Sequence, residues 1–177
     1  VSAVNNAALL ERARDVQFPV LQLAEKNIVA LRQVRAGLQS AVSAGEVDAL
    51  DAVKKSASDL RSDVKAMIEI DEALKETAGS IDRSLEAYLE TSVGLSEKML
   101  KGTADFSSME SQINTMTEQF NKTEKSLGDF RDEQKLEFTN AIKSANEKAQ
   151  NTVYFGVGIG VLTIAILFAV GMTIATS

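Results

Sequence analysis

The sequence predicts an all-α fold: an antiparallel up-down-up-down four-helix bundle whose fourth helix continues into a C-terminal transmembrane helix. Apolar residues recur at alternating steps of three and four along four successive segments, a spacing typical of helices in bundles and coiled coils. Short glycine-containing stretches separate the segments. With only one Pro and ten Gly in 177 residues, the chain has little material for turns and is expected to form a few long helices.

The first helix is predicted to have about 42 residues, with an apolar seam that begins at Leu9. It is expected to end before Gly45, which suits the left-handed conformation that closes many helices. Pro19 lies inside this helix and removes one backbone hydrogen bond. It predicts a kink near Gln17 and Phe18, the alternative being a regular helix that begins at Phe18 after a separate turn. The apolar seam consists of Leu9, Ala13, Val16, Val20, Leu23, Asn27, Leu31, Val34, Leu38 and Val42.

The second segment runs from Glu46 to Gly79, and the third runs from Ser80, a predicted N-cap, to Gly102. Their lengths of about 32 and 22 residues do not match, although neighbouring helices of an up-down bundle span a similar height. The second helix is therefore expected to unwind or turn away between Asp71 and Gly79. Asp71 falls on the apolar stripe, and we interpret it as a sign that this end of the helix is more exposed to solvent.

The fourth helix is predicted to begin at about Ser108 and to run without a break into the membrane. Ser107 and Glu110 have the spacing of a capping box, with Phe106 as its hydrophobic staple. The apolar stripe then continues from Met109 to Thr152. Gly128 is the only weak point, and one glycine costs about 1 kcal/mol without ending a long helix.

The C-terminal residues 149–177 contain no Lys, Arg, Asp or Glu. Residues 153–175 would form about 35 Å of helix, enough to cross a hydrocarbon core of about 30 Å. The predicted domains are residues 1–152, an extracytoplasmic helical domain, and residues 153–175, a transmembrane helix. Gly156 and Gly160 form a G-x-x-x-G pattern that permits close packing of membrane helices.

Both termini of an antiparallel four-helix domain lie at the same end, so the first helix is expected to begin beside the membrane. Residues 1–10 are uncharged and are interpreted as following a preceding membrane helix, which makes the sequence a fragment. Lys143 and Lys148 alone do not fix the orientation by the positive-inside rule.

The composition argues against catalysis. The chain has no His, Cys or Trp, so the usual ligands of zinc, haem and iron-sulfur clusters and the common nucleophilic arrangements are missing. The acidic residues are spread along helical faces, as on a solvated surface. We therefore predict no enzyme, with no catalytic residues, metal site or cofactor. The formal net charge of −6 and the absence of a basic run argue against a nucleic-acid partner.

Two stretches carry a family resemblance: FPVLQLAEKNIVALRQV, from Phe18 to Val34, and KGTADFSSME, from Lys101 to Glu110. Together with the helix pattern of the whole chain, they resemble the sensor region of bacterial methyl-accepting chemotaxis receptors with a four-helix-bundle ligand-binding domain. The resemblance implies a homodimer in the bacterial inner membrane, with residues 1–152 on the periplasmic side. It also implies a small solute or a periplasmic binding protein as partner, and signalling by displacement of the fourth helix. Sensor histidine kinases and some diguanylate cyclases have similar input domains.

Amino-acid receptors of this family bind a carboxylate with arginines on the first helix and polar groups on the fourth. The candidate ligand-binding residues at comparable heights here are Arg32, Arg35, Gln112, Thr115 and Gln119. Guanidinium groups in a partly desolvated groove suit an anionic solute. The fuller arginine pattern of those receptors is absent, so amino-acid specificity is not predicted.

A different class of protein remains open, namely a tail-anchored coiled-coil protein that acts in tethering or assembly. Its fourth stripe would lead directly into a C-terminal anchor, with Gln134 at a core position of the seam. An upstream membrane span and a downstream Arg-rich junction in the complete gene product would favour the receptor. A Met close before Val1 and a stop after Ser177 would favour the anchor.

Overall fold

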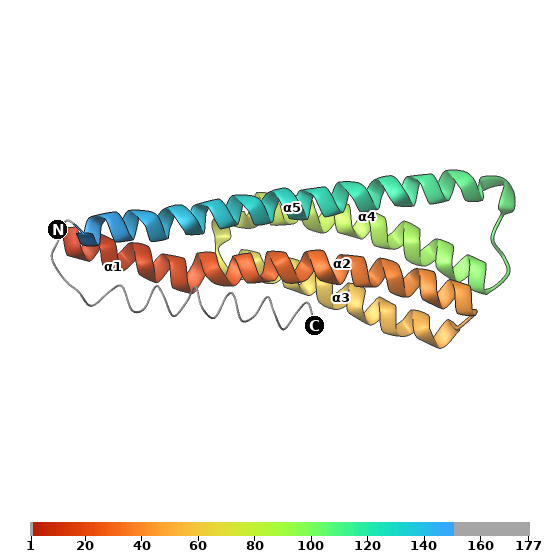
Figure 1. Cartoon of the computed structure of the whole chain (residues 1–177). Coiled ribbons are helices and arrows are strands. Elements are labelled where there is room, and N and C mark those ends of the chain that lie inside the picture. The colour runs from red at the N-terminus through yellow and green to blue at the C-terminus, as the bar shows by residue number, and fades with distance from the viewer. Residues whose placement is uncertain (1, 151–177) are drawn as a thin grey trace. The chain divides into compact units, whose positions relative to one another are not determined.

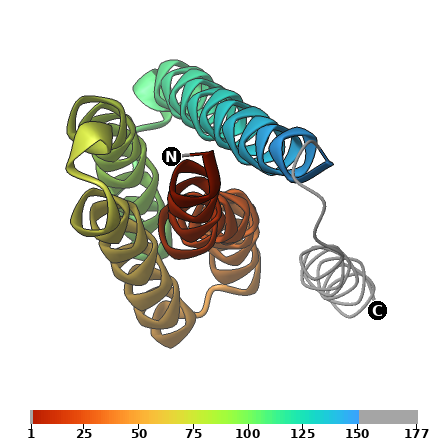
Figure 2. The ribbon, with the colours of Figure 1, turned by 90° about the vertical axis from the view of Figure 1, so that its left-hand side faces the viewer.

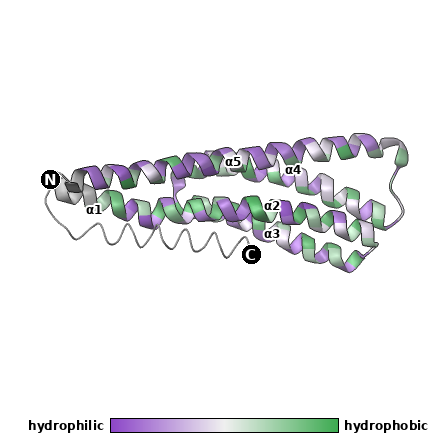
Figure 3. Ribbon diagram, in the orientation of Figure 1, coloured by the Kyte–Doolittle hydropathy of each residue, from purple (hydrophilic) through white to green (hydrophobic). Residues whose placement is uncertain are grey.

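The computed structural model describes residues 2–150, and this part of the chain is helical without any strand. The all-α prediction is therefore confirmed for these residues. Among them, no helix has both the length and the apolar character needed to cross a bilayer (Figure 3). The predicted membrane segment, residues 153–175, lies outside the described residues, as do Gly156 and Gly160.

The helices fall into two compact units. One combines residues 2–18 with 135–150, and the other is Pro19–Gln134. In chain order the elements are α1 (Ser2–Arg12), the π-helix η1 (Ala13–Gln17), α2 (Phe18–Ala44), α3 (Val47–Ile70), the 3-10 helix η2 (Glu72–Leu74), α4 (Lys75–Leu100) and α5 (Phe106–Gln150).

In the unit Pro19–Gln134, helices α2, α3, α4 and α5 surround one hydrophobic core (Figures 1 and 2). Every helix contributes fully buried side chains, because its apolar stripe faces the other three. Fully burying one aliphatic side chain stabilises the fold by about 1.5–3 kcal/mol. The core includes Leu31, Val34 and Leu38 of α2, Leu60, Val64 and Met67 of α3, Ile81, Leu85 and Tyr88 of α4, and Phe120, Leu127 and Phe130 of α5.

Contacts between helices in this unit show that neighbours run antiparallel, since residue numbers rise along one helix as they fall along the other. Between α3 and α4, ion pairs join Lys54 to Glu97 and Arg61 to Asp82. Between α2 and α5, Arg32 pairs with Glu124, and Arg35 lies over the ring of Phe120. Between α2 and α3, Lys26 pairs with Asp63, and Gly37 approaches Val53.

The other unit pairs the N-terminal helices with the last part of α5. Ala13 and Ala145 are buried in it. The rings of Phe18 and Phe138 lie 5.9 Å apart with a tilt of 41° between their planes. The contact between Phe18 and Phe138 joins the N-terminal helices to the last part of α5 within this unit.

The predicted helix disruption before Pro19 takes the form of a π-helical turn. The backbone N–H of Phe18 donates to the carbonyl of Ala13, five residues earlier, and regular α-helix begins at Phe18. One extra residue in a turn is a common way to accommodate a proline that has no N–H to donate. The alternative start at Phe18 is the observed one, although the preceding residues form α1 rather than an isolated turn.

The predicted helix ends at Gly45 and Gly102 are confirmed. Both glycines have positive φ, 71° and 66° respectively. Each closes its helix with a Schellman pattern, in which Glu46 N–H donates to the Ala41 carbonyl and Thr103 N–H donates to the Lys98 carbonyl. A Schellman pattern depends only on a glycine in the left-handed conformation and on backbone hydrogen bonds to nearby residues. Such a helix end can therefore be located from sequence alone.

The helix break in the middle of the chain is confirmed at Asp71, but the predicted start of the third helix at Ser80 is wrong. Asp71 is extended, with φ −143°, and its side chain accepts a hydrogen bond from Ala73 N–H at 3.0 Å. Asp71 thereby caps the 3-10 helix η2, which leads directly into α4. Helix α4 begins at Lys75 and contains both Gly79 and Ser80. The two middle helices have 24 and 26 residues, which removes the expected mismatch in length.

The predicted capping box of the fourth helix is also wrong. Helix α5 begins at Phe106, and the cap is the carboxylate of Asp105, which accepts from the Ser107 N–H at 2.9 Å and from the hydroxyls of Ser107 and Ser108. These bonds hold the pKa of Asp105 below its usual value. Phe106 is 84% exposed and forms no staple. A carboxylate is favoured at this helix end because it meets free N–H groups and the positive end of the helix dipole.

Two glycines in helix interiors predict opposite effects of alanine. At Gly37, an added Cβ would lie 2.7 Å from Cγ2 of Val53 on α3, whereas at Gly94 it would meet nothing within 4 Å. We expect Gly37→Ala to destabilise the fold, by about 1–3 kcal/mol. Gly94→Ala should stabilise it by about 0.5–1 kcal/mol through helix propensity and chain entropy. Urea unfolding of both variants checks this, and stabilisation by both substitutions would contradict the close approach of α2 and α3.

Candidate ligand-binding site

A pocket of about 260 Å³ lies among α2, α4 and α5 within the unit Pro19–Gln134. Its volume is near the lower end of small-molecule sites, about 300 Å³. Most of the side chains around it are aliphatic, aromatic or methionine. The lining consists of Arg35, Leu38, Gln39, Val42 and Ser43 of α2, Tyr88, Leu95, Ser96 and Met99 of α4, and Ile113 and Met116 of α5.

Two aromatic rings and one guanidinium group pack together at this site: Tyr88 and Arg35, which line the pocket, and Phe120, which contacts both. Tyr88 is only 1% exposed, and its ring meets that of Phe120 edge-on at 5.5 Å. Cζ of Arg35 lies 4.4 Å from the centroid of the Phe120 ring, within the range of a cation–π interaction. Burial raises the pKa of Tyr88, while a hydrogen bond with Ser92 and the charge of Arg35 oppose that shift. The phenol is therefore neutral near pH 7 beside a permanent cation.

Arg35 has no counter-ion among residues 2–150, unlike Arg32 and Arg61 of the same unit. Nε of Arg32 lies 2.6 Å from Oε1 of Glu124, and Arg61 pairs with Asp82 and Glu86. No carboxylate within the described part of the chain forms an ion pair with Arg35. The pocket thus combines an apolar lining with one uncompensated positive charge.

The structure separates the five candidate residues rather than gathering them into one site. Arg35 alone lines the pocket. Gln112 donates to the Ser108 hydroxyl at 2.7 Å, and the Thr115 hydroxyl donates to the Ser111 carbonyl at 2.9 Å, so both bond within α5.

Arg32 and Gln119 also stay apart from the pocket lining. The ion pair of Arg32 with Glu124 is largely exposed. The side-chain oxygen of Gln119 is buried and finds no hydrogen-bond donor among residues 2–150. Within a single chain, the five candidate side chains therefore do not form one anion-binding site.

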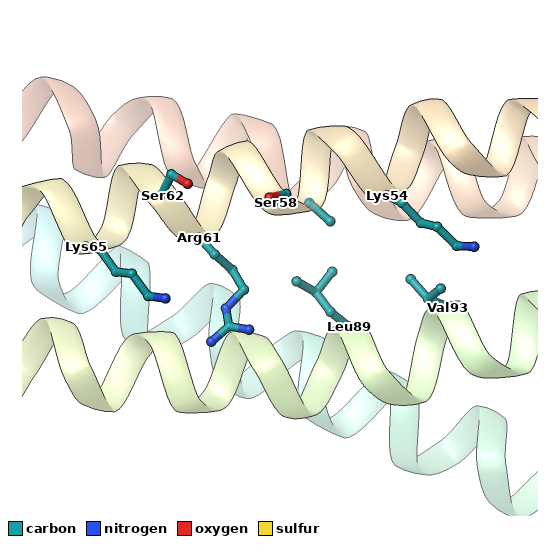
Figure 4. A pocket seen from close by; sticks show the side chains of 8 residues that line it. Lys54, Ser58, Arg61, Ser62, Lys65, Leu89 and Val93 are labelled. Carbon is teal, nitrogen blue, oxygen red and sulfur yellow. The ribbon is translucent and has the colours of Figure 1, made fainter.

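A second, shallower groove of about 300 Å³ follows the line between α3 and α4 (Figure 4). Lys54, Arg61 and Lys65 extend from α3 towards it, facing Leu89 and Val93 of α4. Two of these cations are already neutralised, since Lys54 Nζ lies 2.6 Å from Glu97 Oε1 and Arg61 binds both Asp82 and Glu86 at 2.8 Å. This groove is better explained as a set of ion pairs that joins the helices than as an anion site.

The ion pairs between α3 and α4 predict a pH dependence of stability. Arg61 holds the pKa of Asp82 below its usual value, first through their hydrogen bonds and then through its charge. A carboxyl group with a lowered folded-state pKa stabilises the fold above its unfolded pKa of about 3.9 and loses this contribution as the pH falls through the folded value. We expect Asp82→Asn to cost about 1 kcal/mol at pH 7 and progressively less below about pH 4.

Urea unfolding across this pH range measures the effect of Asp82→Asn. The matched control is the same substitution in an Arg61→Gln background, where the cost at pH 7 should largely disappear. An equal cost at pH 7 and pH 2.5, or an unchanged cost without Arg61, would contradict the assignment of the ion pair.

Sequence reasoning missed most of the pocket lining, because those residues look like ordinary core positions of three separate stripes. Leu38 and Val42 belong to the first stripe, and Met99 and Met116 belong to the third and fourth. Within residues 2–150, no cluster of three or more acidic side chains is arranged to hold a metal ion.

Comparison of the chain with protein-family models, with curated proteins and with solved structures gave no match.

Proposed function

We propose that this chain is the extracytoplasmic sensor region of a bacterial transmembrane receptor of the methyl-accepting chemotaxis type. In this proposal, residues 1–152 form an antiparallel up-down-up-down four-helix bundle on the periplasmic side of the inner membrane. Residues 153–175 cross the membrane, and Gly156 and Gly160 allow close packing of membrane helices. The receptor acts as a homodimer, and a small solute or a periplasmic binding protein supplies the signal.

The observation that supports this proposal best is the length and continuity of α5. The helix has 45 residues, from Phe106 to Gln150, and it passes through Gly128 without interruption. Gln150, the last residue that the structure describes, lies three residues before the first residue of the predicted membrane segment. A helix without a break can carry a shift of one or two ångströms along its axis, whereas a flexible linker would absorb it.

The position of the pocket supports the same mechanism. Ile113 and Met116 bring α5 into the pocket lining, opposite side chains of α2 and α4. A molecule bound there would contact the signalling helix directly. If it binds more tightly to one of two positions of α5, it shifts the population of receptors towards that position. Transmission requires no contact between the ligand and the membrane segment.

A hybrid receptor tests the proposal. In it, the sensor and membrane region of a chemotaxis receptor is replaced by the corresponding region of the full gene product, and the output is the activity of the coupled kinase. We expect a solute from a library of amino acids and organic acids to change the kinase activity. If no solute or periplasmic extract changes it in a correctly inserted hybrid, the proposal is wrong.

Continuity of α5 is tested in the same hybrid by a matched pair of triple variants. Lys143, Asn146 and Glu147 are exposed on α5, so replacing all three leaves the buried stripe intact. Glycine at these positions weakens the helix by about 1 kcal/mol per residue relative to alanine. The glycine variant should lose most of the response while the alanine variant retains it. Equal responses would contradict signalling through a rigid α5.

A further inference from the structure

We propose that the pocket among α2, α4 and α5 binds a small organic monoanion with an apolar body, such as an aromatic or branched-chain carboxylate, within a single chain. This inference goes beyond the proposed function, because such a site can exist in the chain whether or not the chain transmits a signal. It differs from an anion held jointly by Arg32, Arg35 and the polar residues of α5, since only Arg35 of that set lines the pocket.

The apolar part of the ligand is inferred from the pocket lining. Methionine side chains from two different helices, Met99 and Met116, face the pocket together with Leu38, Val42 and Ile113. Methionine is flexible and polarisable, so it adapts to apolar molecules of different shape and makes favourable contacts with aromatic rings. A strongly hydrated solute such as a sugar or a dicarboxylate would leave polar groups without partners against these side chains.

The anionic group is inferred from Arg35. Its guanidinium group is charged at all relevant pH values and has no carboxylate partner among the described residues. The ring of Phe120 supports one face of the guanidinium group, leaving its edge N–H groups as the donors that suit a carboxylate. Arg35 is half-buried, so its charge is screened less by water than the charge of a fully exposed side chain.

The size of the ligand follows from the volume of about 260 Å³. Drug-sized molecules occupy sites of about 300–1,000 Å³, so this pocket suits a molecule with a single ring or a short branched chain. Met99 and Ile113, 36% and 40% exposed, lie among the lining residues. They give the site a partly open rim through which a small molecule can enter.

Methyl NMR of methionine tests the site directly. The chain has five methionines, of which Met99 and Met116 line the pocket, while Met67 is fully buried in the core between the helices. We would label the methionine methyl groups of the 177-residue chain in lipid nanodiscs and titrate it with benzoate and 4-methylpentanoate. We expect saturable shifts of the Met99 and Met116 signals, with little change at Met67.

Two further probes on the unmodified protein separate the two parts of the ligand. Benzamide has the ring without the charge, and acetate has the charge without the apolar body. Both should bind at least tenfold more weakly than benzoate. If benzamide binds as well as benzoate, Arg35 does not select an anion. If neither benzoate nor 4-methylpentanoate causes saturable shifts at Met99 and Met116, the proposed ligand class is wrong.

Arg35→Gln should weaken benzoate binding at least tenfold while leaving benzamide binding unchanged. The matched control is Lys122→Gln, which removes the same charge from an exposed position on α5 and should leave both affinities unchanged. Ile113→Trp, at a partly exposed rim position, should fill the pocket and abolish binding of both probes. Equal loss in the Lys122 variant would indicate a general charge effect, and unchanged binding in the Arg35 variant would overturn the site.

Concentration-dependent shifts of Met99 and Met116 without ligand would instead indicate that a second copy of the chain covers the pocket. That result would contradict a ligand site that is open in one chain.

Ligand binding at Met99 and Met116 is tested independently of the signalling response. Binding without any response in the hybrid receptor would leave this site established and refute the receptor function. A response in the hybrid without shifts at Met99 and Met116 would refute this site and leave the receptor function in place.

Discussion

Replacing Tyr88 with alanine is expected to lower the free energy of unfolding by about 3–5 kcal/mol, the usual cost of removing a large buried aromatic side chain. Tyr88 is among the largest fully buried residues, and its ring packs edge-on against Phe120, at a centroid distance of 5.5 Å. Removing it leaves a cavity beside Phe120 and deprives α4 and α5 of a shared aromatic contact. The pocket that Tyr88 lines would lose one wall.

Urea unfolding of the 177-residue chain in mild detergent, followed by circular dichroism, measures this loss. The matched control is Tyr88→Phe, which keeps the ring and should cost no more than about 1 kcal/mol, since it removes only the hydroxyl and its interaction with Ser92. A loss below about 1 kcal/mol for the alanine variant would mean that the ring is not part of a packed core.

Replacing Asn27 with leucine is expected to stabilise the protein by about 2 kcal/mol. Asn27 is 0% exposed in α2, and neither its side-chain oxygen nor its nitrogen has a hydrogen-bond partner among the described residues. Leaving a buried polar group unsatisfied costs about 1–3 kcal/mol. Leucine has nearly the shape of asparagine and adds apolar burial in a position that the rest of the seam already fills with apolar side chains.

The matched control is Asn121→Leu on the exposed face of α5, where we expect a change within about 0.5 kcal/mol. Thermal unfolding of both variants distinguishes a site-specific gain from a general effect of added leucine. If Asn27→Leu destabilises the protein, the amide must make a favourable interaction, such as with a buried water molecule, that offsets its desolvation. That result would contradict our explanation of Asn27.

The number of long helices and most of their ends could be predicted from sequence because they depend on local features. The three-and-four spacing of apolar residues identified the buried faces, and Gly45 and Gly102 marked helix ends through a backbone conformation that glycine adopts easily. The errors at Ser80 and Ser107 arose where two good capping residues compete. Asp71 and Asp105 each provide a carboxylate that accepts from a backbone N–H. Asp71 starts the 3-10 helix η2 that leads into α4, and Asp105 starts α5.

The pocket was harder to predict, because it depends on how three helices are rotated about their own axes. Residues one turn apart on a helix are indistinguishable by spacing alone, yet Arg32 faces Glu124 while Arg35 lies over Phe120. Asn27 shows the same limit, since it falls on the predicted seam but only the structure shows that its amide lacks a partner. Periodicity places a residue on a face, whereas its contacts depend on the neighbouring helices.

The location of the helical region relative to a membrane is the central claim, and cysteine labelling in intact cells tests it most directly. The 177 residues contain no cysteine, so Ser58→Cys, on the exposed surface of α3, and Ser177→Cys can be introduced one at a time. The host is the full gene product in its native cells, with any cysteine outside this region replaced. We expect a membrane-impermeant maleimide to label the cysteine at position 58 in intact cells and the one at position 177 only after permeabilisation. Labelling of both positions in intact cells, or of neither, would contradict a periplasmic helical domain joined through α5 to a membrane-spanning segment.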